Sequence, residues 1–174
     1  RALAGIFSPD SGEIDLHGYT VSLLAIGVGF QRALSGRENI YLSGMLLGFS
    51  EEQIREKIDE IISFAGLGKF IDMPVQTYSS GMYSKLAFSI TAILETDIML
   101  IDEVLSVGDA RFKKKSYKKM KDLIMDEDRT VIIVSHNSDT IRNLCTSVLW
   151  LHEGEVRMMG DTGEVMDAYE EFMQ

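Results

Sequence analysis

Two uninterrupted apolar runs constrain the fold of this chain more than any other feature of its sequence. They are Ile98–Ile101 and Val131–Val134. Parallel strands that helices cover on both faces are apolar throughout, whereas strands with one solvated face alternate apolar and polar residues. Polar residues follow each run, Asp102 and Glu103 after the first and His136 after the second. The runs therefore predict two parallel strands that deliver polar side chains to one edge of a sheet.

The segments around these runs complete an α/β pattern. The stretch between them predicts a helix that carries Phe112, Tyr117, Met120, Leu123 and Ile124. Periodicity predicts strands at 13–17, 21–26, 147–151 and 155–159. Residues 1–7 are predicted to be the end of a helix, and residues 161–172 to form the last helix. Strands that alternate with helices indicate an α/β fold with a parallel sheet flanked by helices.

The region from about residue 38 to residue 95 differs, because its periodicity is helical throughout. Ser50 followed by Gln53 is typical of a capping box at a helix start. One face of that helix carries regularly spaced isoleucines, Ile54, Ile58, Ile61 and Ile62. A second helix is predicted after Ser79. We therefore expect one domain, residues 1–174, with an all-helical subdomain at 38–95.

Composition excludes several classes of protein. The 174 residues carry 17 Lys and Arg against 27 Asp and Glu, a formal net charge of −10, whereas general nucleic-acid binding needs a basic surface. No apolar run approaches the roughly 20 residues that cross a bilayer. The single cysteine, Cys145, cannot form an internal disulfide, which is typical of a reducing compartment. We expect a cytosolic protein that binds no nucleic acid.

The polar residues that follow the two apolar runs have the chemistry of nucleotide hydrolysis. Adjacent side chains at a strand end point in different directions, so Asp102 can hold Mg²⁺ while Glu103 faces a water molecule. A neutral imidazole at His136 can donate a hydrogen bond to a phosphate oxygen. The alternative is a strand that ends in solvated acids. His136 at the same edge favours the catalytic interpretation.

The helix start at 78–82 is a third feature. Small hydroxyl residues and a glycine at a helix N-terminus form a cradle of free N–H groups that binds anions. The alternative is an ordinary N-cap, which is the better explanation of this segment taken alone. No cluster of cysteine and histidine has the spacing of zinc ligands.

Together these residues resemble the ATP-binding subunits of ABC transporters over essentially the whole chain. The resemblance implies a P-loop NTPase-type α/β fold, in which helices flank a parallel sheet and an all-helical insertion interrupts it. The resemblance implies that Asp102 is the Walker B aspartate that holds Mg²⁺ and that Glu103 polarises the attacking water. It also implies that His136 is the switch histidine, and that Gln31 is the Q-loop glutamine, which contacts Mg²⁺ and the nucleotide. The other nucleotide-binding residues that it implies are Ser79, Ser80, Gly81 and Met82 of the signature and Asp109 of the D-loop.

The 174 residues depart from the family pattern in four places. The signature has Tyr78, Ser80 and Met82 where Leu, Gly and Gln are usual. The D-loop has Gly108 where leucine is usual, and the segment after Gln31 is shorter than in most importers. A P-loop needs Gly-x-x-x-x-Gly-Lys-Ser/Thr, and the only Gly-Lys pair, at 68–69, is followed by phenylalanine. Residues 1–14 resemble the stretch that directly follows the P-loop. We therefore expect truncation of the gene or of its product, and no ATP hydrolysis by these residues alone.

Three segments resemble the corresponding segments of ABC exporters of lipid-linked surface polysaccharide, including O-antigen and teichoic acid. They are residues 36–42, 78–82 and 102–109. The resemblance implies ATP and Mg²⁺ as cofactors, and a second copy of the subunit and transmembrane permease subunits as partners. It places the protein on the inner face of a bacterial cell membrane, where the full-length subunit hydrolyses ATP to drive export. Two alternatives stay open: a non-transport ABC ATPase, and a remnant that binds a partner but no nucleotide.

Overall fold

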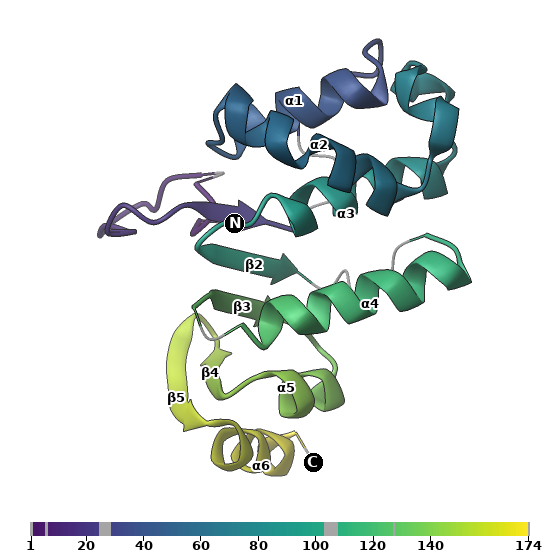
Figure 1. Cartoon of the computed structure of the whole chain (residues 1–174). Helices are drawn as coiled ribbons and strands as arrows, with labels where there is room; N and C mark the ends of the chain where they lie inside the picture. Colours follow the sequence, from purple (N-terminus) through teal and green to yellow (C-terminus); the bar gives the residue numbers. More distant parts are fainter. Residues whose placement is uncertain (1, 6, 25–28, 103–107, 127, 174) are drawn as a thin grey trace. The chain divides into compact units, whose positions relative to one another are not determined.

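The chain divides into two compact units, Arg1–Ile132 and Ile133–Gln174. The computed structural model describes residues 2–5, 7–24, 29–102, 108–126 and 128–173. Figure 1 shows the helices and strands in chain order. The boundaries expected from the sequence, one domain at 1–174 and a subdomain at 38–95, remain predictions.

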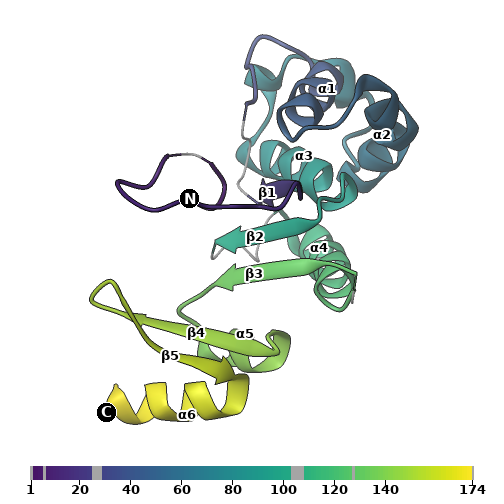
Figure 2. The ribbon, with the colours of Figure 1, turned by 90° about the vertical axis from the view of Figure 1, so that its left-hand side faces the viewer.

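A three-stranded sheet has the order β1-β2-β3 (Figure 2). Its strands are β1 (Val21–Leu23), β2 (Ile98–Asp102) and β3 (Thr130–Val134). β1 and β2 run parallel, with Val21 paired to Ile98. Before the two strands begin, the Asp97 carboxylate accepts hydrogen bonds from the Thr20 N–H (2.8 Å) and hydroxyl (2.7 Å). The predicted strand at 21–26 is confirmed over 21–23, and its residues 25 and 26 lie outside the described residues.

The two apolar runs differ in burial. In β2, Met99, Leu100 and Ile101 are buried, as expected for a strand covered on both faces. In β3, Ile132 is 39% exposed and Val134 is 57% exposed, so the prediction of burial on both faces is wrong for this strand. β2 is the central strand of the sheet, whereas β3 is an outer strand. An apolar run predicts a strand, but its position in the sheet decides how much of it is covered.

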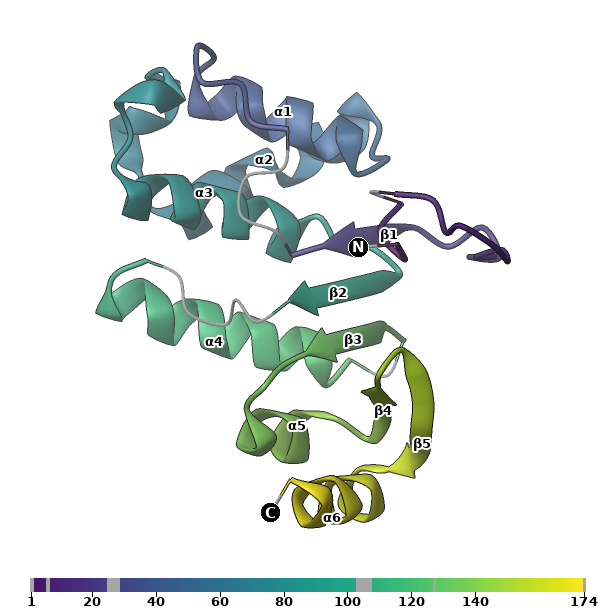
Figure 3. The ribbon, with the colours of Figure 1, turned by 180° about the vertical axis from the view of Figure 1, so that it is seen from behind.

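The helices that lie between β1 and β2 in the sequence are grouped on one side of β1 (Figure 3). They are α1 (Gly36–Leu46), α2 (Glu51–Ala65) and α3 (Ser80–Ile93), with short 3-10 turns η1 (Gly68–Asp72) and η2 (Val75–Thr77). The predicted capping box at Ser50 is confirmed, and α2 ends at Gly66, whose φ of 64° suits a glycine. The core that joins these helices contains Ile40, Ile54, Ile58, Ile61, Leu86, Ile90 and Leu94.

The next helix, α4 (Ala110–Ile124), buries one narrow stripe of side chains. The stripe consists of Phe112, Ser116, Met120 and Leu123. Tyr117, which was expected on the apolar face, is 54% exposed. Each residue turns an α-helix by about 100°, so Tyr117 lies about 140° around the helix from Phe112. The lysines of α4 cover most of its solvated side.

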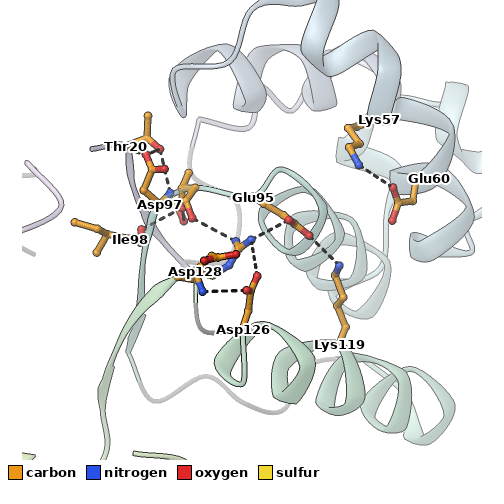
Figure 4. Close-up of polar contacts among 12 residues, drawn as sticks. Thr20, Lys57, Glu60, Glu95, Asp97, Ile98, Lys119, Asp126 and Asp128 are labelled. Carbon is orange, nitrogen blue, oxygen red and sulfur yellow. Dashed lines mark hydrogen bonds and ion pairs between the residues drawn. The ribbon is translucent and has the colours of Figure 1, made fainter. Parts of the chain in front are cut away.

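A polar network joins the segments that follow α3 and α4 to the start of β3 (Figure 4). The Arg129 guanidinium, whose side chain is 9% exposed, pairs with Glu95 (2.8 Å) and Asp126 (3.5 Å) and donates to the Thr96 carbonyl (3.3 Å). Lys119 also pairs with Glu95 (3.2 Å). Burial raises the pKa of Glu95, but the two cations outweigh it and the pKa is lowered. The network therefore favours the ionised form of Glu95.

The N-terminal segment contradicts two predictions from the sequence. Residues 13–17 form no strand, because the Asp15 carboxylate accepts the His17 N–H (2.8 Å), and His17 and Gly18 have φ values of 50° and 80°. Positive φ values close a turn here and interrupt an extended chain. The predicted helix end is also wrong, since residues 2–5 form a turn.

The second unit contains an antiparallel pair, β4 (Ser147–His152) and β5 (Glu155–Asp161), and two helices, α5 (Ser138–Leu144) and α6 (Thr162–Phe172). The predicted strands at 147–151 and 155–159 and the last helix are confirmed. Trp150 anchors α6 on β4, with its ring centroid 5.5 Å from Tyr169 and 5.3 Å from Phe172. Arg142 links α5 to α6 through Asp167 (2.6 Å) and Glu170 (3.0 Å).

Candidate functional site

The start of α3 positions the four predicted signature residues, Ser79, Ser80, Gly81 and Met82. Ser79 is the N-cap, and its Oγ accepts a hydrogen bond from the Met82 N–H (3.2 Å). Ser79 and Ser80 are exposed. The first N–H groups of any α-helix have no partner within the helix, so those of Ser80 and Gly81 are the donors that an anion would meet there.

The structure shows open space around Gly81, which the sequence could not indicate. A Cβ added to Gly81 would meet only the Ser79 Oγ, at 3.9 Å, and its φ is not positive. Neither backbone conformation nor packing among the described residues therefore requires a glycine at this position. The absence of a side chain leaves open space at the helix start, where a group from outside the chain can approach the backbone.

Tyr78 fixes the segment that leads into α3. Its hydroxyl donates to the Phe70 carbonyl (2.7 Å), and its N–H donates to the Val75 carbonyl (3.0 Å). Burial raises the pKa of the Tyr78 phenol. A Cβ on Gly36 would lie 2.3 Å from the Tyr78 hydroxyl, so this close approach requires a glycine at the first residue of α1. The tyrosine that replaces the usual leucine of the signature thus ties η1, η2 and α1 to the candidate site.

The buried Asn39 of α1 holds the backbone of the exposed Gln31. Asn39 Oδ1 accepts the Gln31 N–H (2.7 Å), and Asn39 Nδ2 donates to the Gln31 carbonyl (3.0 Å). The same amide donates to the carbonyls of Leu34 (3.2 Å) and Ser35 (2.8 Å). Sequence reasoning assigned no role to Asn39, because the complete burial that requires these polar partners is seen only in the structure.

Asp109 is the N-cap of α4. Its Oδ1 accepts the N–H groups of Arg111 (3.1 Å) and Phe112 (3.0 Å), and its Oδ2 forms an ion pair with Lys85 of α3. Lys85 and the two N–H groups lower the pKa of Asp109 to about 2. Partners within the chain therefore occupy both oxygens of this carboxylate, and its role as a nucleotide contact remains a prediction.

The predicted catalytic residues are described only in part. Asp102 is the exposed last residue of β2, as expected for a residue at a sheet edge. Glu103 lies outside the described residues. His136 is exposed and belongs to the second unit, between β3 and α5. The convergence of Asp102, Glu103 and His136 on one nucleotide therefore remains a prediction.

No group of three or more His, Cys, Asp and Glu side chains that could hold a metal ion occurs among the described residues. Mg²⁺ is usually held by one or two carboxylates together with water and substrate phosphates. Exposed Asp102 and the amide of exposed Gln31 provide oxygens of the kind that Mg²⁺ takes. Their role as metal ligands remains a prediction.

Known proteins of similar sequence include ATP-binding proteins of two kinds of export system. The O-antigen export system ATP-binding protein RfbB of Klebsiella pneumoniae is 39% identical over 171 residues, which cover 98% of this chain and 69% of that protein. The chain belongs to the family of ABC transporter ATP-binding subunits. RfbB of Myxococcus xanthus is 43% identical over 98% of this chain, and the teichoic acids export protein TagH of Bacillus anthracis is 44% identical over 99%.

This ABC chain spans only part of the length of most of these relatives, 39% of the Myxococcus protein and 31% of the Bacillus protein. No family model matches the chain. None of the helices in the described part is both long enough and apolar enough to cross a membrane.

Solved structures agree on the ABC cassette fold. An ATP-binding subunit of an ABC transporter superposes with a TM-score of 0.76 at 19% identity and covers 97% of this chain and 75% of that chain. A dimeric ATP-binding cassette bound to ADP and Pi has a TM-score of 0.60 at 20% identity over 83% of this chain and 63% of that chain. These matches confirm the predicted α/β fold with a parallel sheet flanked by helices.

Proposed function

We propose that this chain is part of an ATP-hydrolysing subunit that drives export of a lipid-linked surface polysaccharide or teichoic acid across the cytoplasmic membrane. The start of α3 carries the proposal, because exposed Ser79 and Ser80 precede Gly81, which has open space where a side chain would be. A phosphate that approaches there meets helix N–H groups and no obstructing side chain. The O-antigen and teichoic acid export proteins among the relatives support the choice of cargo.

In this proposal ATP lies between two copies of the subunit, and residues 79–82 of one copy contact phosphates held by the other. Asp102 would hold Mg²⁺, and the ion would supply positive charge to neutralise the transferred phosphoryl group. Glu103 accepts a proton from the attacking water and orients it. His136 donates a hydrogen bond to a phosphate oxygen.

Closure of the two copies around ATP, followed by hydrolysis, would move permease subunits between two states. The region from α1 to α3 would contact the permease, with Gln31 at its hinge, and Asn39 holds the backbone of that hinge in place. The subunit would be cytoplasmic and peripheral on the inner face of a bacterial cell membrane. The net charge of −10 supports partners other than nucleic acid.

Replacement of Glu103 in the full-length protein tests the ATPase. We expect Glu103→Gln to lower ATP turnover by about 10²–10⁴-fold, the usual worth of a positioned general base, while ATP binding survives. Dimers that depend on ATP should then accumulate, which analytical ultracentrifugation measures. Glu52→Gln, on the exposed face of α2, is the matched control and should leave turnover unchanged. Equal loss of ATP binding and turnover would make Glu103 structural and contradict the proposal.

Deletion of the full-length gene distinguishes export from import and from the two alternatives without transport. We expect finished lipid-linked polymer to accumulate on the cytoplasmic side while its synthesis continues, as fractionation and labelling of the polymer would measure. Normal surface polymer together with loss of uptake of a small solute would indicate an importer. Normal surface polymer and normal transport would favour a non-transport ATPase or a remnant that binds only a partner.

A further inference from the structure

We propose that Lys85 and Asp109 form a positioning clamp that holds the start of α3 and the start of α4 in one fixed arrangement. The inference rests on the proposed function, because α3 begins with the signature and α4 begins after the D-loop. In that proposal the start of α3 contacts phosphates held by the second copy of the subunit. A fixed start of α4 beside it keeps the start of α3 in the orientation that meets that copy.

The clamp joins two elements through a single carboxylate. Asp109 caps α4 through Oδ1 and pairs with Lys85 through Oδ2, so any movement of Lys85 acts directly on the first turn of α4. Lys85 lies in the second turn of α3, and its side chain is 20% exposed. Its ammonium also lies 5.7 Å from the centroid of the Phe112 ring. Both the charge and the alkyl chain of Lys85 therefore contact the N-terminal part of α4.

Gly108 makes this close approach possible. Its φ is 75°, and a Cβ there would lie 3.0 Å from Phe112 Cδ1 and 3.2 Å from Lys85 Cγ. The lysine side chain thus packs against the backbone just before α4 as well as against its capping residue. The glycine that replaces the usual leucine of the D-loop gives Lys85 the room to reach Asp109.

The helices stay packed without the ion pair, which separates positioning from folding. Phe112 of α4 packs edge-on against Phe88 of α3 (5.8 Å) and Phe64 of α2 (5.7 Å). Lys115 of α4 lies 4.2 Å from the Phe64 ring centroid and donates to the Phe64 carbonyl (3.3 Å). The Asp109 side chain is 57% exposed, and ion pairs open to solvent contribute little to stability. Loss of the clamp should therefore loosen the arrangement of the two helix starts and leave the fold intact.

The clamp is tested in the full-length protein with Lys85→Met and Asp109→Asn. Methionine keeps the alkyl chain without the charge, and asparagine remains a good N-cap. We expect each variant to weaken ATP-dependent dimerisation about tenfold, measured by analytical ultracentrifugation in the Glu103→Gln background, with melting temperatures within a few degrees of the parent. The double variant should lose no more than either single variant, because both break the same pair.

Two controls make the test specific. Lys115→Met removes a lysine that also contacts an aromatic ring but does not touch Asp109, and should leave dimerisation unchanged. Lys85→Arg keeps the charge and should retain most of the dimerisation. Additive losses in the double variant, or dimerisation unaffected by Lys85→Met, would overturn the clamp while the proposed function stands. Absence of ATP-dependent dimers in the Glu103→Gln parent would overturn both.

Discussion

Replacement of Gly81 by alanine should separate stability from activity. The added Cβ meets only the Ser79 Oγ at 3.9 Å, an ordinary van der Waals distance, and the φ of Gly81 is not positive. Alanine is favoured over glycine within helices by about 0.5–1 kcal/mol, so the free energy of unfolding should rise by up to about 1 kcal/mol. The same methyl group obstructs the N–H donors that would contact phosphate, and loss of one such donor typically costs about 10²–10³-fold in turnover.

Urea unfolding and ATP turnover of the full-length protein measure the two effects. Gly44→Ala is the matched control, because a Cβ there would lie 2.6 Å from Ile54 Cδ1 in the core between α1 and α2. That overpacked variant should lose about 1–3 kcal/mol of stability. The reasoning about open space at α3 would be refuted if Gly81→Ala unfolded more easily than wild type. It would equally be refuted if the variant kept wild-type turnover.

Two further predictions concern Asn39 and Asp109. Asn39→Ala removes four hydrogen bonds of a fully buried side chain and should lower the free energy of unfolding by about 2–4 kcal/mol in urea titrations. Asn143→Ala removes one exposed hydrogen bond and should change the free energy of unfolding by less than about 0.5 kcal/mol. Equal losses for the two variants would contradict the role of Asn39 in holding the backbone of Gln31. The pKa of Asp109 is depressed to about 2 from an unfolded value of about 4, so its stabilisation is present above pH 4 and disappears as pH falls toward 2. The stability difference between wild type and Asp109→Asn should shrink over that interval in acid titrations and vanish below pH 2. A difference that persisted in full below pH 2 would assign the stabilisation to another group.

Local sequence rules determined most of the elements around the candidate site. Helix α2 begins at Ser50 and ends at Gly66 because the cap residues satisfy backbone groups within a few residues of themselves. The start of α3 at Ser79 follows the same rule. The apolar run of β2 and the hairpin of β4 and β5 were also predicted, since burial patterns of strands repeat over neighbouring residues.

Only the tertiary structure decided which residues those elements bring together. Alternation at 13–17 predicted a strand that a turn replaces, and equal apolar runs became a buried β2 and an exposed β3. The pairing of Lys85 with Asp109 joins two helices across 24 residues of sequence and had no local signal. The hydrogen bonds between Asn39 and Gln31 span only eight residues, but they depend on the burial of Asn39, which the sequence did not show. Such contacts depend on how helices pack and on which neighbours a strand acquires. The neighbouring residues in the sequence include the helix caps and show the apolar periodicity. They do not include the partners that come into contact through long-range packing.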